Sequence, residues 1–480
     1  DDPTTQSQPP SSFDPDRDGH LAVIGTGGSG KSTVLRTLAA AAGFTVRGGP
    51  VQVYALDFGA LGLSMLEGLP HVGSVIPVDD VERVQRLIRW LRQTVDERSV
   101  RYASVQAASI TEFRAASGEA AEPRLLLLLD GYAAFRQSFD TGSAGSLTDA
   151  LTSIAADGRP VGVHVVLTAD RMASIPSSLA SLVPKRLVLR AADENELSLS
   201  GAPRDLFDQS TPAGRGWLDG REVQVAVLGG STSMAAQSRA LERLGEAIRR
   251  NTSWPAAVAI GRLPDAVDLA GLPVEVGGSP VLGLEDETLG PIGIPTSGTF
   301  VVAGPPGSGR TTTVHTIVRS AQRAQPGLRT VLLSPVRSPL ATRLAWYRSA
   351  VGVAEVAEVA DAMLAQVRED NAAWLVVVEA PQEFLNSSAD LPLQDLVKVL
   401  RQSDNLVVAE GDTQSLAGSW PLLQALRFSR RGIVLQPDQT DGDLLLRTSF
   451  PRVRRAEFPT GRGLLVREGR VAKVQVAQPS

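Results

Sequence analysis

A glycine-rich loop that occurs twice constrains this chain more than any other feature. The first copy reads Gly-Thr-Gly-Gly-Ser-Gly-Lys-Ser over residues 25–32, and the second reads Gly-Pro-Pro-Gly-Ser-Gly-Arg-Thr over residues 304–311. Each copy follows an apolar run (21–24 and 300–303) and precedes a helix-like stretch. GxxxxGK[ST] between a strand and a helix is the pattern of a phosphate-binding loop. Both copies are therefore predicted to lie at strand–helix junctions.

The first loop has the groups needed to bind a nucleotide together with its magnesium ion. Its glycines let backbone N–H groups surround the phosphates at the positive end of a helix dipole. Lys31 is expected to reach the terminal phosphates, and Ser32 is expected to bind Mg²⁺. Asp130 ends the apolar run 125–129 and is expected to hold the same ion through water. The predicted ATP-binding residues are Gly25, Thr26, Gly27, Gly28, Ser29, Gly30, Lys31, Ser32, Thr33 and Asp130, with Ser32 and Asp130 as the metal-binding pair.

The residue after Asp130 predicts slow ATP hydrolysis at the first loop. Many ATPases with this loop have a glutamate there, which polarises the attacking water, whereas this chain has Gly131 followed by Tyr132. Phosphate binding and water activation are separate requirements, so the loop should still bind MgATP. We therefore expect tight binding at the first loop with weak or absent hydrolysis, and we assign no residue a catalytic role.

The second loop departs further from the pattern. Arg310 keeps the positive charge but replaces a compact ammonium with a bulky planar group, and the strand 375–378 ends in Glu379, one methylene longer than aspartate. Two interpretations stay open: a relic kept for packing, with weak or absent nucleotide binding, or a former ATPase site whose surface now docks a partner. The candidate nucleotide-binding residues of this copy are Gly304, Gly307, Ser308, Gly309, Arg310, Thr311 and Thr312.

The surrounding pattern predicts an α/β fold. Apolar runs at 51–57, 125–129 and 164–168 alternate with helix-like stretches such as 32–42 and 145–156. Continuous apolar runs between helices are typical of parallel strands that are covered on both faces. The chain is therefore expected to form parallel sheets flanked by helices.

Matching segments at the ends of the two halves indicate a duplicated domain. The shared endings are 212–217 with 223–226 and 459–464 with 474–477. A turn-rich stretch near 251–255 separates the halves. We expect two tandem RecA-like P-loop NTPase domains, each a mostly parallel sheet flanked by helices, at residues 1–250 and 251–480.

Composition narrows the class of partner. The chain has 480 residues, too many for one ordinary core, and 43% hydrophobic with 21% charged residues is typical of globular domains. A net charge of −5 argues against nucleic acid as the main partner.

The absence of cysteine excludes disulfides and thiolate chemistry, and the spacing of His20, His71, His164 and His315 is not that of metal ligands. No apolar run approaches the ~18 residues of a membrane span, and a start at Asp1 without a signal peptide suggests a piece of a longer protein.

Polar residues at other strand ends have two interpretations each. Arg186 and Arg190 could reach the phosphates of a neighbouring subunit, although arginines at strand ends are more often solvated. Thr168 and Asp170 could sense the terminal phosphate of a nucleotide, or they could simply cap their strand.

Several segments resemble the FtsK/SpoIIIE class of P-loop ATPases. Residues 20–25, which run into 29–38, are similar to the class as a whole. Further segments resemble the EccC/EssC branch, the multi-ATPase motors of type VII secretion. These segments are Asp1-Asp2-Pro3 with Gln6 and Gln8, Tyr54–Gly59, Gly68–Gly73, Leu129–Tyr132, Gly162–Arg171 and Pro212–Gly216. The resemblance extends over nearly the whole chain.

The resemblance implies a place within a larger secretion protein. Family members carry membrane helices and a catalytically complete ATPase upstream of two degenerate ATPase domains, and this chain would correspond to those two. Carried over by motif, Lys31, Ser32 and Asp130 bind MgATP. The resemblance further implies that the last domain binds the C-terminal signal peptide of a small secreted helical-hairpin substrate and that the active form is a homo-oligomer. It also implies that the chain is a cytoplasmic portion of a bacterial inner-membrane secretion protein.

Two other functions stay open as alternatives. A fragment of an FtsK/SpoIIIE-type DNA translocase needs a hydrolytic glutamate, basic DNA-contacting residues and usually a terminal winged helix. This chain instead has Gly131, an acidic balance, and an end at Ser480 directly after its second half. A metabolic P-loop kinase is disfavoured by the tandem copy with an altered second loop. The sequence therefore favours an ATP-binding regulatory and substrate-receiving module, with DNA an unfavoured partner.

Overall fold

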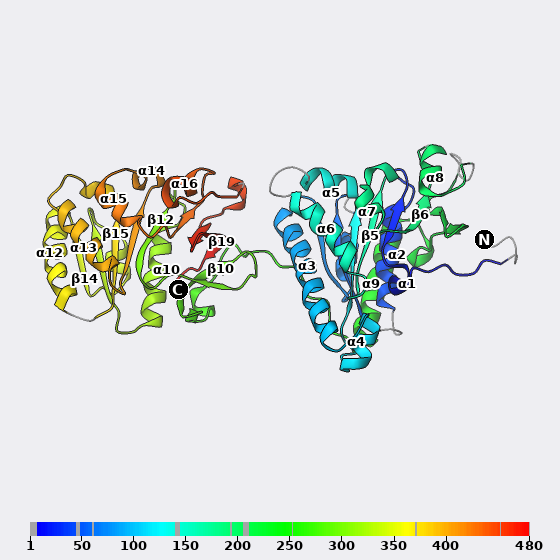
Figure 1. Cartoon of the computed structure of the whole chain (residues 1–480), viewed down its shortest axis with the longest axis horizontal. Helices are drawn as coiled ribbons and strands as arrows, with labels where there is room; N and C mark the ends of the chain where they lie inside the picture. The colour runs from blue at the N-terminus through cyan, green and yellow to red at the C-terminus, as the bar shows by residue number, and fades with distance from the viewer. Residues whose placement is uncertain are drawn as a thin grey trace. The chain divides into compact units, whose positions relative to one another are not determined.

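Two compact units make up the chain, Asp1–Gly261 and Arg262–Ser480 (Figure 1). The computed structural model describes residues 7–44, 49–59, 62–139, 145–192, 194–204, 211–251, 253–369, 372–451 and 453–479. The family-like residues Asp1, Asp2, Pro3 and Gln6 lie outside this set. No helix in these ranges is long and apolar enough to cross a membrane.

The boundary between the units falls later than the predicted division between residues 250 and 251. The stretch after this point has the composition of a linker, but it binds to the first unit. Ala257 N–H donates to the Pro70 carbonyl at 2.9 Å, and Ile260 N–H donates to Ser74 Oγ at 2.9 Å. Ile260 is also buried in the apolar core of that unit. Because these contacts hold the segment, the unit extends to Gly261.

The first unit is built on an eight-stranded sheet in the order β3-β2-β4-β5-β1-β6-β7-β8. The first six strands in this order run parallel to their neighbours, and only the β6–β7 and β7–β8 pairs are antiparallel. The strands are β1 (Leu21–Ile24), β2 (Val51–Asp57), β3 (Val72–Pro77), β4 (Arg124–Asp130), β5 (Val163–Ala169), β6 (Lys185–Leu189), β7 (Arg215–Leu218) and β8 (Arg221–Gln224). The predicted parallel α/β fold is confirmed.

Helices cover both faces of this sheet (Figure 1). One face packs against α2 (Lys31–Gly43) and α9 (Met234–Asn251), and the other packs against α3 (Val81–Ser104), α5 (Tyr132–Phe139) and α6 (Gly145–Asp157). The central strands are buried on both faces, which explains their unbroken apolar sequence. Shorter helices complete the unit: α1 (Pro15–Asp18), α4 (Ile110–Ser117), α7 (Ser177–Ala180) and α8 (Glu194–Ser200).

The second unit repeats the strand order of the first. Its sheet runs β11-β10-β19-β18-β17-β12-β16-β15-β13-β14, with β9 paired to β10. The strands are β9 (Glu275–Val276), β10 (Ser279–Glu285), β11 (Pro291–Gly293), β12 (Gly298–Ala303), β13 (Arg329–Ser334), β14 (Arg348–Val351), β15 (Trp374–Glu379), β16 (Leu406–Gly411), β17 (Gly432–Leu435), β18 (Arg462–Arg467) and β19 (Arg470–Val476). The equivalence of β12 with β1, and of each neighbour in turn, confirms the predicted duplication.

The helices of the second unit follow the same arrangement. One face of its sheet carries α10 (Arg310–Ala324) and α11 (Leu340–Arg343), and the other carries α12 (Val353–Glu369), α13 (Asp390–Arg401) and α15 (Pro421–Leu426). Two short helices, α14 (Thr413–Leu416) and α16 (Asp441–Leu446), belong to a further apolar cluster beside β17 and β18. In both units the glycine-rich loop follows a central strand, so it lies at the carboxyl edge of the sheet, where α/β proteins bind ligands.

Candidate nucleotide-binding site

The first loop joins β1 to α2 and leaves the start of the helix open to a ligand. Gly30 precedes α2 with a φ of 108°, a left-handed conformation that favours glycine. It offers no side-chain hydrogen bond to the first turn, so the N–H groups there are left for an anion. A Cβ on Gly30 would lie 3.0 Å from the backbone nitrogen of Gly214. Backbone conformation and close packing therefore both require glycine at this position.

Lys31 closes the loop on itself. Its Nζ donates to the carbonyl oxygens of Gly25 at 2.6 Å and Thr26 at 2.9 Å. The same ammonium forms a 2.9 Å ion pair with Asp170, whose side chain is 74% exposed. An exposed carboxylate is solvated and mobile enough to release the lysine. Nucleotide phosphates can thus replace Asp170 as the counter-charge of Lys31.

Ser32 and Asp130 meet as the metal-binding prediction requires. Ser32 Oγ donates to Asp130 Oδ2 at 2.6 Å, and Thr168 Oγ1 donates to Asp130 Oδ1 at 2.6 Å. Gly131 N–H in turn donates to Thr168 Oγ1 at 2.8 Å. A hydroxyl and a carboxylate beside a phosphate loop form a donor set that fits a Mg²⁺ ion with retained waters. Thr168 therefore orients Asp130. The sequence offered two other interpretations of Thr168, a sensor of the terminal phosphate or a cap of its strand, and the observed contact is neither of these alone.

The backbone at residue 131 has a conformation that favours glycine over the glutamate that this position often carries. Gly131 has a φ of 84°, and a Cβ built on it would lie 3.0 Å from the Phe58 carbonyl oxygen. A side chain there would be strained in conformation and would crowd the backbone of the loop after β2. The conformation of the backbone here is thus consistent with the glycine in the sequence.

In each unit a glycine directly before a β-hairpin donates a hydrogen bond to the glycine-rich loop. In the first unit Gly214 N–H donates to the Ser29 carbonyl at 2.8 Å, just before the β7–β8 hairpin. In the second unit Gly461 N–H donates to the Ser308 carbonyl at 2.9 Å, just before the β18–β19 hairpin. The recurring Pro-x-Gly-Arg-Gly endings thus hold the phosphate loops in place. The sequence shows these endings as a repeat. It does not predict that they contact the loops, because the contacts join residues far apart in the chain.

The second loop is occupied by its own arginine. Arg310 Nη1 donates to the Gly304 carbonyl at 2.8 Å, and Nε forms a 2.8 Å ion pair with Glu410 Oε1. Glu410 lies opposite Val302 in the sheet, the place that Thr168 occupies opposite Val23 in the first unit. A small hydroxyl in one loop site is thus replaced by a carboxylate in the other.

A second carboxylate lies beside this ion pair. Glu379 is the strand partner of Glu410, and its Oε2 is buried without a hydrogen-bond partner. Burial raises the pKa of the Glu410 carboxyl, the Arg310 guanidinium opposes this rise, and the Glu379 carboxylate adds to it. The second loop therefore presents two acids and one arginine in the region where a phosphate chain would lie.

Other sequence-selected residues are placed as follows. Arg190 lies at the first loop, where its carbonyl accepts a hydrogen bond from Thr26 N–H at 2.8 Å. Arg186 has a buried Nε without a partner. The histidines are structural: His20, His71 and His164 each hydrogen-bond a backbone carbonyl. Within the described ranges no three acidic or histidine side chains form a metal cluster.

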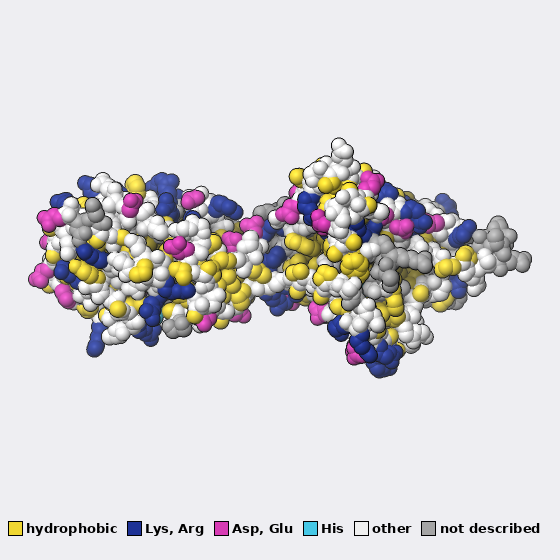
Figure 2. All heavy atoms as spheres, turned by 90° about the horizontal axis from the view of Figure 1, so that it is seen from below, with side chains coloured by type: hydrophobic (Ala, Val, Ile, Leu, Met, Phe, Trp, Pro, Cys, Tyr) yellow, Lys and Arg dark blue, Asp and Glu magenta, His cyan; other side chains and the backbone are white. Residues whose placement is uncertain are grey.

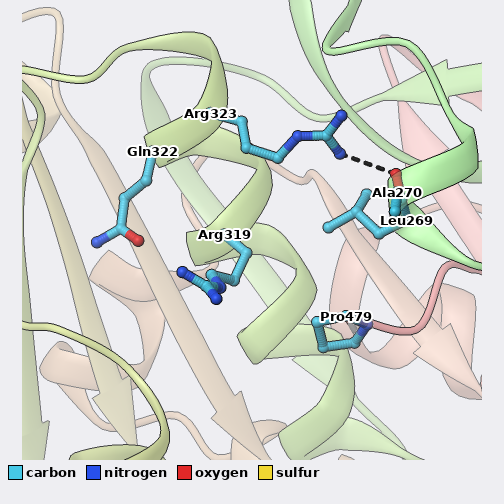
Figure 3. A pocket seen from close by; sticks show the side chains of 6 residues that line it. All are labelled: Leu269, Ala270, Arg319, Gln322, Arg323 and Pro479. Atoms are coloured by element: carbon cyan, nitrogen blue, oxygen red, sulfur yellow. Dashed lines mark hydrogen bonds between the residues drawn. The ribbon is translucent and has the colours of Figure 1, made fainter.

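A cavity of about 470 Å³ in the second unit lies away from the loop. Arg319, Gln322 and Arg323 line it from the C-terminal half of α10, more than two turns beyond Arg310 (Figure 3). Figure 3 shows Arg323 turned toward the Leu269 carbonyl, to which it donates at 2.8 Å. Because the cavity is at the opposite end of the helix, it is no part of the nucleotide site.

Two strand–loop–helix sites at the carboxyl edges of parallel sheets define a tandem P-loop NTPase. The sequence profile of the FtsK/SpoIIIE family matches residues 3–242, and the chain belongs to that family. The homologues bear EccC and EssC names. ESX-4 secretion system protein EccC4 of Mycobacterium tuberculosis is 32% identical over 327 residues, which are 66% of this chain and 25% of that protein. ESX secretion system protein EccC of Thermomonospora curvata is 26% identical over 488 residues, 93% of this chain and 36% of that protein.

Solved structures share the complete fold. The structure of Thermomonospora curvata EccC (ATPases 2 and 3) in complex with a signal sequence peptide matches with a TM-score of 0.77 and 24% identity, covering 100% of this chain and 92% of that one. EssC (ATPases 2 and 3) from Geobacillus thermodenitrificans matches with a TM-score of 0.77 and 22% identity, covering 100% and 95%. The chain spans 25% and 36% of the length of the two curated relatives, and its counterpart in the solved structures is the ATPase 2 and 3 pair.

Proposed function

We propose that the first unit binds MgATP at residues 25–32 and hydrolyses it slowly or not at all. The observation that carries this proposal is the 2.6 Å hydrogen bond from Ser32 to Asp130, directly before a glycine in the left-handed conformation. Lys31 would bind the terminal phosphates, and Ser32 with Asp130 would hold Mg²⁺. The magnesium ion would neutralise phosphate charge, but water activation would lack a protein base.

We further propose that the second loop, residues 304–312, holds no nucleotide. A triphosphate there would have to displace Glu410 from Arg310 and lie beside two carboxylates with one balancing cation. Buried like charges repel strongly because the local dielectric constant is low. In the first unit the acid that pairs with the loop cation is Asp170. Its side chain is exposed and can move into water. This favours the relic interpretation of the second loop.

Titration with MgATP tests both statements together. We expect one binding event per chain in the wild type and the same single event in Arg310→Ala. The variant Arg310→Lys/Glu410→Thr restores the residues of the first unit and should add a second event. Turnover should be on the order of 10⁻³ s⁻¹ or slower, the range of a P-loop without catalytic assistance. Two events in the wild type, or rapid steady-state hydrolysis, would contradict the proposal.

We propose that the chain is the substrate-receiving part of a type VII secretion ATPase. In this proposal it follows an upstream ATPase domain and a membrane part in the cytoplasmic portion of a bacterial inner-membrane protein, and it works as a homo-oligomer. The second unit would bind the C-terminal signal peptide of a small secreted helical-hairpin protein. The EccC and EssC relatives and the peptide-bound Thermomonospora structure support this role.

The first unit suggests where such a peptide would bind. Its own segment 257–261 crosses the edge of the sheet at β3: Tyr54 Oη donates to the Val258 carbonyl at 3.0 Å, and Arg83 Nε donates to the Ile260 carbonyl at 2.7 Å. Ile260 inserts into the core between β3 and α3. The first unit thus already accepts one extended, partly apolar segment at this edge.

The same edge in the second unit is formed by β14 and the start of α12. β14 ends its sheet, as β3 does, and no described strand of this unit pairs with its outer side. Tyr347 precedes it with a 51% exposed side chain, fixed by an edge contact with Trp374 and by the Arg329 guanidinium 5.1 Å above its ring. A rigid, half-exposed aromatic group beside a free strand edge is suited to an apolar peptide. We propose this edge as the peptide-binding surface.

Fluorescence anisotropy with a labelled C-terminal peptide of a helical-hairpin export substrate tests the surface. Tyr347→Ala removes the exposed ring and should weaken peptide binding by about tenfold or more. Phe428→Ala, which removes a 62% exposed ring from another part of the same unit, is the matched control and should leave the affinity unchanged. Equal effects of the two variants would exclude the β14 edge.

A fragment of a DNA translocase is the alternative function. Figure 2 shows acidic and basic side chains interspersed on the visible face of each unit, without one continuous basic field. The net charge is −5, and the residue after Asp130 is glycine. Binding to duplex DNA with a steep salt dependence, together with no peptide binding, would favour the translocase.

A further inference from the structure

Arg190 follows β6, the strand next to β1 on the side away from Asp130. Its backbone is tied to the first loop, because the Arg190 carbonyl accepts hydrogen bonds from Thr26 N–H at 2.8 Å and Thr26 Oγ1 at 3.1 Å. These two hydrogen bonds therefore fix the position of the Arg190 backbone relative to the loop. The sequence alone leaves two interpretations for Arg190: a group that reaches the phosphates of a neighbouring subunit, or a solvated arginine at a strand end.

The side chain of Arg190 lies over the loop of its own unit. Its Nη2 is 3.9 Å from the position that a Cβ on Gly28 would take. Arg190 is partly buried, and its guanidinium has no hydrogen-bond or ion-pair partner among the residues that the structure describes. A partly buried guanidinium with no such partner among these residues is unusual, since the cost of desolvating its charge is not compensated by them. Within the described part of the chain no group accepts from its donors, which lie beside the tip of the glycine-rich loop.

The second unit lacks this cation. Leu435 lies against Gly304 as Leu189 lies against Gly25, so the residue equivalent to Arg190 is Gln436. The unit with the standard loop lysine thus has the additional arginine, and the unit with the arginine–glutamate pair does not.

We propose that Arg190 is a nucleotide-binding residue that acts within its own subunit on the phosphate chain held by residues 25–32. A guanidinium can donate two parallel hydrogen bonds to one phosphate group, which an ammonium cannot match. Arg190 would approach the chain from the β6 side and Lys31 from the helix side. This inference rests on the proposed binding of MgATP at the first loop.

Calorimetric titration of the chain with MgATP and MgADP, at a concentration where it is monomeric, tests the assignment. Arg190→Gln should raise Kd by about 10- to 100-fold, the range for one lost charged hydrogen-bonding group. It should also lower the slope of log Kd against log salt, because one cation fewer faces the phosphates. Arg190→Lys should recover part of the affinity. Arg239→Gln removes the same charge from the exposed side of α9 and should change nothing.

The outcomes separate this inference from the proposed function. If the wild type does not bind MgATP, both are overturned. If the wild type binds and Arg190→Gln binds equally well, only the role of Arg190 is overturned. A loss that appears solely in oligomers would show action across subunits and would overturn it as well. Thermal unfolding of each variant checks that a weaker affinity does not come from lost structure.

Discussion

Lys31→Ala should abolish measurable nucleotide binding by the chain, with a loss of ATP affinity on the order of 100-fold or more. The lysine is the loop's own cation at the start of α2, and among the described residues its ammonium contacts the Gly25 and Thr26 carbonyls and Asp170. All of these contacts can be exchanged for phosphate oxygens. Because the second loop is proposed to be closed by Arg310, no other site should compensate for the loss.

The loss should come without unfolding. The Lys31–Asp170 pair is partly exposed, so removal of the lysine leaves no buried unpaired charge. Asp170→Asn is the matched variant at the other end of the same ion pair, and its effect has the opposite sign. It removes the competitor for Lys31, so ATP binding should be kept or tightened. Retained ATP affinity in Lys31→Ala, or a strong loss in Asp170→Asn, would mean that the loop does not bind phosphate through this lysine.

The sequence predicted those features of the fold that depend on local pattern. Both glycine-rich loops lie at strand–helix junctions, and Asp130 lies within hydrogen-bond reach of Ser32 as its place at a strand end required. The parallel order of the strands follows from apolar runs that alternate with helices. These predictions succeeded because each signal is short and its structural context is fixed by the chain on either side.

Features that depend on long-range contact were not predicted. The hydrogen bond from Gly214 to Ser29 joins residues far apart in sequence, although its duplication at Gly461 and Ser308 was visible as a repeat. The role of Glu410 as partner of Arg310 could not be inferred, because strand register sets it. The boundary near residue 250 was set by composition, but hydrogen bonds of a linker-like segment decide where the first unit ends.

Acid should destabilise the first unit between pH 6.5 and about 4, because two buried histidines must stay neutral. His20 Nε2 donates to the Ala155 carbonyl at 2.7 Å, while its Nδ1 accepts Val165 N–H at 2.9 Å. Protonation of Nδ1 would break the second bond. His164 Nδ1 donates to the Gly19 carbonyl at 2.9 Å, and its Nε2 is buried without a partner. A proton added to either ring would therefore be a buried and poorly solvated charge.

The physical cause is the same for both rings. Burial lowers the pKa of His20 to about 4, and the Arg159 guanidinium adds to the effect. Burial also lowers the pKa of His164 to about 4, helped by His20, whose ring centroid is 6.0 Å away, and by Arg124, while Asp16 opposes the shift. The unfolded chain binds these protons near pH 6.5 and the folded chain does not. The stability they support is thus complete above pH 6.5 and falls as the pH drops toward 4.

Urea unfolding at pH 7 and pH 5 measures the effect. A shift of this size is worth about 3 kcal/mol per histidine once the pH is below 4, so each should contribute about 2 kcal/mol to the difference between pH 7 and pH 5. His20→Gln/His164→Gln removes both titrating groups and should flatten the dependence of unfolding free energy on pH. His315→Gln, at a partly buried histidine of the second unit whose pKa burial also lowers, should flatten that dependence less than the double variant does. A double variant with the slope of the wild type would show that acid acts through other groups, such as the Asp16–Arg124 ion pair, whose carboxyl has a lowered pKa and should weaken only at still lower pH.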